Sequence, residues 1–137
     1  MNPVHATNPG NEALHLAKAE EYLGAAAMLL DGRHFDAAAS SASIAGIRAS
    51  DAICAATLSR RWTGDDHNGA VGLLAAAGPT GATGARLLKS LLPMKNRNQY
   101  GLQEFTDDQA SRAVQMASDL VALARQVVTD RGASSNG

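Results

Sequence analysis

The sequence has few aromatic residues and almost no net charge, and both absences narrow the classes of function. Aromatic residues make up 4% of the 137 residues, so few ring faces are available on which nucleic-acid bases could stack. Twelve basic against thirteen acidic residues leave a formal net charge of −1, too little for a global field that attracts nucleic acid or an anionic membrane. We therefore expect any binding of an anion to be local.

Cysteine is nearly absent, and long apolar runs are absent altogether. The single Cys54 cannot form an intrachain disulfide, and its apolar helical surroundings predict a buried thiol rather than a nucleophile. No apolar run approaches the ~20 residues of a membrane span, and residues 1–10 lack the apolar centre of a signal peptide. The sequence thus predicts a cytoplasmic protein that does not associate with a membrane.

What the sequence has in quantity is alanine and aliphatic residues at helical spacing. Hydrophobic residues make up 45% of the chain, enough for one packed core at this length. Apolar side chains recur every three or four residues, and no run of four or more alternating residues predicts a strand. We expect an all-α fold, an antiparallel bundle of four long helices plus one short helix. This single domain covers residues 11–130, between a flexible leader at 1–10 and a flexible tail at 131–137.

Signals at the ends of the expected helices set their boundaries. Asn8 or Asn11 suits the N-cap of the first helix, and Gly32 ends it because glycine readily adopts the left-handed conformation. The glycine-rich stretch 78–84 predicts a loop between helices, since it lacks the Gly-Lys-Ser/Thr ending of a P-loop. Pro93 either kinks the chain or begins a new helical turn. The expected helices cover residues 11–30, 34–58, 70–77, 85–92 and 107–130.

Two acidic segments are predicted to cap helices rather than to hold a metal ion. Thr106 and Gln109 form a capping-box pattern at the start of the last helix. Asp65 and Asp66 precede the short helix, where carboxylates favour the exposed amides of a helix start. Consecutive residues point in different directions, and no second pair of ligands occurs at helical spacing. We therefore expect no metal and no cofactor.

Asp51 falls on the core-facing side of the longest predicted helix, in the same arc as Ile47 and Cys54 at about 100° per residue. A buried carboxylate needs a partner, because burial of an unpaired charge is costly. Arg48, three residues earlier, can form a local ion pair. Alternatively Asp51 reaches an arginine of another helix, and we expect it to orient Arg97.

The segment 93–101 is polar and basic, follows a leucine-rich run and ends at a glycine. The planar fork of Arg97 is suited to bidentate binding of a phosphate. Arg86 and Lys89 can add positive charge nearby, or all of these side chains are simply solvated surface. The binding residues predicted within the segment are Lys95, Arg97, Asn98 and Tyr100.

The order of these elements resembles the HEPN superfamily (higher eukaryotes and prokaryotes nucleotide-binding), over roughly residues 13–128. The resemblance rests on the Asp-Gly-Arg-His-Phe-Asp-Ala-Ala end of the first helix, the His-Asn-Gly-Ala-Val turn, the Arg-Asn-x-Tyr segment and the Thr-Asp-Asp-Gln-Ala start of the last helix. It implies a HEPN-like bundle that forms a homodimer, with Arg97 near the dimer cleft. Many members of the superfamily are metal-independent ribonucleases or toxins, paired with a minimal nucleotidyltransferase as antitoxin.

The sequence departs from the ribonucleases of that superfamily in one respect. In those enzymes a histidine follows the motif arginine, whereas here no histidine follows His67. Cleavage of RNA without a metal needs an acid and a base near neutral pH, and tyrosine, with a pKa of ~10, is poorly suited to that task. We therefore expect a homodimer that contacts RNA, a nucleotide or a partner protein through Arg97, Asn98 and Tyr100, without ribonuclease activity.

Two alternatives stay open. In the first, the protein is a metal-independent endoribonuclease toxin of a toxin–antitoxin pair, with Arg97, Tyr100 and His67 as its catalytic residues. His67 or Tyr100 then replaces the missing base. In the second, the chain is a structural helical domain within a larger assembly.

Overall fold

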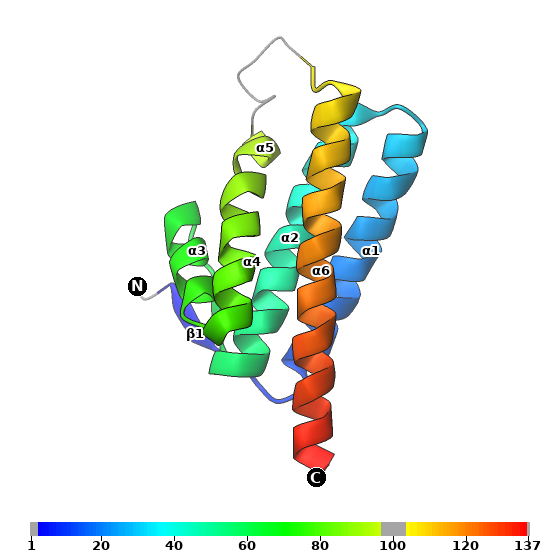
Figure 1. Cartoon of the computed structure of the whole chain (residues 1–137). Helices are drawn as coiled ribbons and strands as arrows, with labels where there is room; N and C mark the ends of the chain where they lie inside the picture. Colours follow the sequence, from blue (N-terminus) through cyan, green and yellow to red (C-terminus); the bar gives the residue numbers. More distant parts are fainter. Residues whose placement is uncertain (1–2, 97–103, 137) are drawn as a thin grey trace.

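The computed structural model describes residues 3–96 and 104–136 and shows a mostly helical domain (Figure 1). The expected helical bundle is confirmed, but the fold is not purely α. Two short strands, β1 (Val4–Ala6) and β2 (Arg60–Trp62), pair in an antiparallel sheet. The helices are α1 (Asn11–Asp31), α2 (Phe35–Leu58), α3 (His67–Ala75), α4 (Gly78–Leu91), α5 (Pro93–Asn96) and α6 (Asp107–Asn136).

The two strands join the open ends of the α1–α2 helix pair. β1 leads into α1 and β2 follows α2, and Val4 pairs with Trp62 while Ala6 pairs with Arg60. Ser59 lets the chain leave α2 by adopting a left-handed conformation with φ of 54°. Residues 4–6, which the sequence places in a flexible leader over 1–10, thus form strand β1. A strand of three residues is too short to produce the alternating pattern that sequence analysis detects.

The connection between α1 and α2 differs from the prediction in which residue turns the chain. Gly32 has φ of −79°, and Arg33 adopts the left-handed conformation, with φ of 63°. The amide of His34 donates to the carbonyl of Leu29 at 2.8 Å, and Arg33 donates to Leu30 at 3.0 Å. This is the Schellman arrangement, displaced by one residue. At the other end of α1, the N-cap is Gly10 without a side-chain hydrogen bond, so neither predicted asparagine caps the helix.

The glycine-rich segment that was expected to form a loop is the first half of α4. Pro79 suits the first turn of a helix, where the missing amide is not needed. A Cβ atom at Gly81 would overlap the carbonyl oxygen of Leu74 in α3, and one at Gly84 would lie 3.0 Å from Leu120 in α6. These glycines let α4 pack closely against both helices. Tertiary packing thus outweighs the low helix propensity of glycine.

The start of α6 is built as the sequence predicts. The Thr106 amide donates to Gln109 at 2.9 Å and the Gln109 amide donates to the Thr106 hydroxyl at 3.1 Å, which confirms the capping box. Phe105 is buried, and its amide donates to Asp36 of α2 at 2.7 Å. The helix continues to residue 136, beyond residue 130, where the sequence predicts its end and the start of a flexible tail.

Small side chains dominate the core. α2 packs against α1, α4, α5 and α6 and is the central helix of the bundle (Figure 1). Ser43 of α2 lies 3.0 Å from the carbonyl of Ala39 and 3.3 Å from that of Leu91, a carbonyl at the end of α4 that its own helix leaves free. Within the described residues, no helix is long and apolar enough to cross a membrane. The largest fully buried apolar side chains are Ile53, Leu74, Leu88, Leu91, Leu120 and Val121.

Candidate functional site

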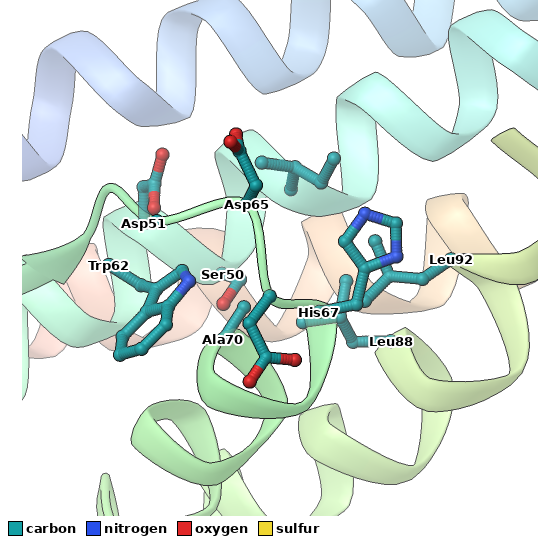
Figure 2. Close-up of a pocket in the computed structure, with 11 residues that line it drawn as sticks. Ser50, Asp51, Trp62, Asp65, His67, Ala70, Leu88 and Leu92 are labelled. Carbon is teal, nitrogen blue, oxygen red and sulfur yellow. The ribbon is translucent and has the colours of Figure 1, made fainter. Parts of the chain in front are cut away.

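A cavity of about 320 Å³ lies between α2, α4 and the segment that connects β2 to α3 (Figure 2). Ile47 of α2 and Leu88 and Leu92 at the end of α4 form its apolar walls. This is the size at which protein cavities begin to accept small molecules. Its polar lining comes from α2, β2 and the start of α3, and consists of Ser50, Asp51, Trp62, Asp65, Asp66 and His67.

Asp51 is the buried acid of this cavity, as its position on α2 predicts. Its side chain is 8% exposed, and its Oδ2 atom lies 4.0 Å from Nη1 of Arg48 and 3.9 Å from Nη2 of Arg61. The local pair with Arg48, one of the two alternatives for Asp51, is confirmed. The pair with Arg61 joins α2 to β2 and has no signal in the sequence. Both distances exceed hydrogen-bond length, so the two pairs are Coulombic contacts.

Burial dominates the electrostatics of Asp51. Removal of the carboxylate from water raises its pKa to about 6, while the positive charges of Arg61 and Arg48 act in the opposite direction. The same two arginines affect His15 of α1, which is also buried. Burial first, and then Arg61 and Arg48, lower the pKa of His15. The cavity is thus backed by a cluster of charges where α1, α2 and β2 meet.

Trp62 forms one wall of the cavity and is held in place by glycines. A Cβ atom at Gly69 would overlap the six-membered part of the indole, and one at Gly64 would lie 3.1 Å from it. The indole nitrogen is buried and has no hydrogen-bond partner among the described residues. Figure 2 shows the indole on one side of the cavity and His67 on the other.

The segment 65–67 caps α3, as predicted. Asp66 is the N-cap, and its carboxylate accepts a hydrogen bond from the amide of Asn68 at 2.9 Å. Asp65 and Asp66 are exposed at the rim of the cavity, and His67 is half-buried. The part of the chain that the structure describes contains no group of three or more side chains that could hold a metal ion.

The predicted binding segment lies largely outside the described residues. Pro93 begins the four-residue helix α5 directly after α4, so the chain restarts as a helix rather than bending within one. Arg97, Asn98 and Tyr100 are not among the described residues, and the expected contact between Asp51 and Arg97 stays a prediction. Lys95 belongs to α5, and its side chain is likewise outside the description.

The stretch that leads into this segment carries positive charge without any acid. From His67 to Gln103 the sequence has no aspartate or glutamate. Arg86 and Lys89 of α4 are exposed, and neither forms an ion pair within the described residues. A groove beside Arg86 contains one carboxylate, Asp119 of α6, which accepts a hydrogen bond from Gln115 at 2.9 Å.

Sequence reasoning found some residues of the cavity and missed others. Asp51 and His67 are identifiable from helical periodicity and from the capping pattern. Ser50 is not identifiable in this way, because no local pattern distinguishes a buried serine from an exposed one in a helix. Arg61 and Trp62 reach the site through a strand pairing between residues 4–6 and 60–62 that no local pattern indicates. The tight approach of Gly69 to the only tryptophan is also invisible before the fold is known.

The fold and the cavity define a mostly helical domain with a partly enclosed polar pocket. Compared with protein-family models and with curated proteins, the sequence has no match. The likeness to the HEPN superfamily therefore stays a prediction from the residues quoted for it.

Proposed function

We propose that the protein is a HEPN-like homodimer that binds an anionic ligand, RNA or a nucleotide, around Arg97, Asn98 and Tyr100 without cleaving it. The observation that carries the proposal is the acid-free stretch from His67 to Gln103. Its described cations on α4 are exposed and have no acidic partner. Unpaired basic side chains next to an arginine-asparagine motif favour a phosphate ligand.

The expected mode of binding is contact with phosphate rather than stacking on bases. The chain has one tryptophan, two tyrosines and two phenylalanines, which offer few platforms for bases. Arg86, Lys89, Lys95 and Arg97 can each neutralise part of a phosphate backbone. Affinity for single-stranded RNA should then fall steeply with salt, with a slope of roughly −0.7 per phosphate contacted.

Fluorescence anisotropy with a labelled single-stranded RNA tests this proposal. Arg97→Ala should weaken binding at least about tenfold, the loss expected for a charge-assisted phosphate contact, and should reduce the salt slope by about 0.7. Arg112→Ala, which removes an exposed arginine of α6, is the matched control and should leave binding unchanged. Equal affinities for the two variants would overturn the assignment of Arg97.

The homodimer and the partner protein are part of the same proposal. Light scattering after size exclusion should give twice the 14.1 kDa mass of the chain. A minimal nucleotidyltransferase encoded beside the gene, or another antitoxin, should co-purify with it. If the protein is a monomer that binds neither RNA nor a nucleotide but only a partner chain, the alternative of a structural helical domain is correct.

A second candidate function is a metal-independent endoribonuclease, and one observation favours it. His67 lines the same cavity as Leu92, which directly precedes α5 and the motif segment. A base for RNA cleavage is therefore available at the end of the bundle where the motif begins. The test is incubation of RNA with the protein in EDTA. This function is established if the wild-type protein cleaves the RNA and both His67→Ala and Arg97→Ala abolish the cleavage. It is excluded if the RNA stays intact with the wild-type protein.

A further inference from the structure

We propose that the cavity beside Asp51 binds a small organic cation, an ammonium or guanidinium group carried on a short apolar stem. This site is separate from the predicted anion-binding segment and does not depend on it. Asp51 receives the cationic head, the rim acids attract it, and the leucines of α4 contact the stem.

The carboxylate of Asp51 has unused hydrogen-bonding capacity. Both arginines approach the same oxygen, Oδ2, at 3.9 and 4.0 Å, and Asp51 forms no hydrogen bond with any described residue. Neither Arg48 nor Arg61 lines the cavity. A side chain that is 8% exposed and ionised normally accepts several hydrogen bonds. A ligand that donates to Oδ1 would supply what the protein does not.

The charge of the lining selects a cation over an anion. Three carboxylates line the cavity, those of Asp51, Asp65 and Asp66, and no lysine or arginine among the described residues does. Asp66 uses one oxygen to cap α3, which leaves Asp65 and the second oxygen of Asp66 at the rim. Arg48 and Arg61 offset part of the charge of Asp51, but neither lines the cavity. The carboxylates of the lining therefore attract a bound cation and repel a bound anion.

The remaining lining suits an organic cation better than a hydrated ion. Ile47, Leu88 and Leu92 provide apolar contact, which favours the burial of methylene groups. Trp62 also lines the cavity, and an indole attracts a cation that lies over its ring. The volume of about 320 Å³ leaves space for a ligand with several carbon atoms rather than for a bare ion alone.

A cationic head on a short apolar stem occurs both in free amines and in the lysine and arginine side chains of other proteins. Two pairs of probes distinguish these sources. Butylammonium and agmatine represent free cations, and N-acetyl-lysine amide and N-acetyl-arginine amide represent side chains within a peptide. Butanol and butyrate are the neutral and anionic controls of similar size.

Trp62 is the only tryptophan and reports on the cavity directly. In a titration followed by tryptophan fluorescence at constant ionic strength, the cations should produce a saturable change. Butanol should bind at least about tenfold more weakly, and butyrate should not bind. If the free amines bind and the amides do not, the ligand is a small molecule; the reverse result identifies a protein side chain. Equal affinities for butylammonium and butanol, or no saturable change with any cation, would overturn the proposal.

Two variants test the named residues. Asp51→Asn keeps the shape of the side chain and should reduce cation affinity at least about tenfold. Asp119→Asn, which changes an acid outside the cavity, is the control and should not reduce it.

Ala70→Leu fills the cavity from α3 without changing its charge and should abolish binding. Ala27→Leu, at an exposed position, is its control. The second pair keeps the test decisive if Asp51→Asn does not fold. Unchanged affinity in Ala70→Leu would place the ligand elsewhere.

The affinity should also depend on pH. A bound cation favours the ionised form of Asp51, whose pKa is raised to about 6 by burial, so affinity should rise as the pH increases through 6. His67→Gln, which removes a histidine of the lining, is the control, and the pH dependence assigned to Asp51 should persist in it. The other ionisable groups around Asp51 are Arg48 and Cys54 on α2, Arg61 on β2, Asp65 and Asp66 at the rim, and His15 behind the two arginines.

Discussion

The chemistry of the described site is set by Asp51, whose side chain is buried while its partners stand at the limit of ion-pair distance. Two arginines lower the energy of the carboxylate, yet the cost of burial is larger, and the pKa rises to about 6. His15 responds to the same arginines and to burial in the same region, and its pKa is lowered. Compared with the unfolded chain, folding therefore shifts both residues toward their neutral forms.

Replacement of Asp51 by asparagine should change how stability depends on pH. The folded protein holds the Asp51 proton more tightly than the unfolded chain, so the contribution of Asp51 is fully present below about pH 4 and is lost as the pH rises through 6. Between about pH 4.5 and pH 7, Asp51→Asn should gain about 2 kcal/mol in free energy of unfolding relative to the wild type.

Urea unfolding of both proteins at these two pH values measures the change. The quantity to compare is the difference in free energy of unfolding between the two proteins at each pH. The lowered pKa of His15 makes stability rise with pH in both proteins, and in the wild type this offsets the loss of stability caused by Asp51. If the difference in free energy of unfolding between the two proteins is the same at both pH values, the pKa of Asp51 is not raised by folding.

Cys54 should be unreactive in the folded protein. It is buried, and burial together with the nearby Asp51 raises the pKa of the thiol to about 12. Because the thiolate is the reactive form, Ellman's reagent should not react at about pH 8 until guanidinium chloride unfolds the chain. Rapid reaction of one thiol per chain under native conditions would contradict the burial that both sequence and structure assign to it.

At the scale of elements, the sequence predicts the long helices well and their connections poorly. The apolar periodicity of residues 11–30, 34–58 and 107–130 matches the observed α1, α2 and α6, because burial of one face determines a long helix. The connections depend on packing that local patterns do not encode. A Cβ atom at Gly81 would overlap the carbonyl oxygen of Leu74 in α3, so glycine fits at this point of helix α4. The β1–β2 pairing brings Trp62 to the cavity.

Two glycine substitutions should have opposite effects on stability. Gly81→Ala places a Cβ atom against the carbonyl oxygen of Leu74, and overpacking against backbone should cost about 2 kcal/mol or more. Gly72→Ala, in the middle of α3 with no atom near the new Cβ, should stabilise the protein by roughly 0.5–1 kcal/mol. Urea unfolding measures both. Equal effects would mean that α4 does not pack against α3 as closely as described.

At the scale of the whole molecule, the chain separates its charges. Acids surround the cavity beneath the β2–α3 connection, and the stretch that runs through α4 toward the motif has cations only. Sequence analysis identifies the basic stretch, because its residues are close together in the chain. It identifies only part of the acidic cavity, because the cavity is assembled from α2, β2, α3 and α4. We propose that the two regions bind ligands of opposite charge.

One incubation of the purified protein with labelled single-stranded RNA in EDTA tests whether the protein binds an anion without cleaving it. The mixture is divided between a native gel and a denaturing gel. Binding without cleavage should produce a shifted band on the native gel and full-length RNA on the denaturing gel. Shortened RNA, or no shift at any protein concentration, would contradict it.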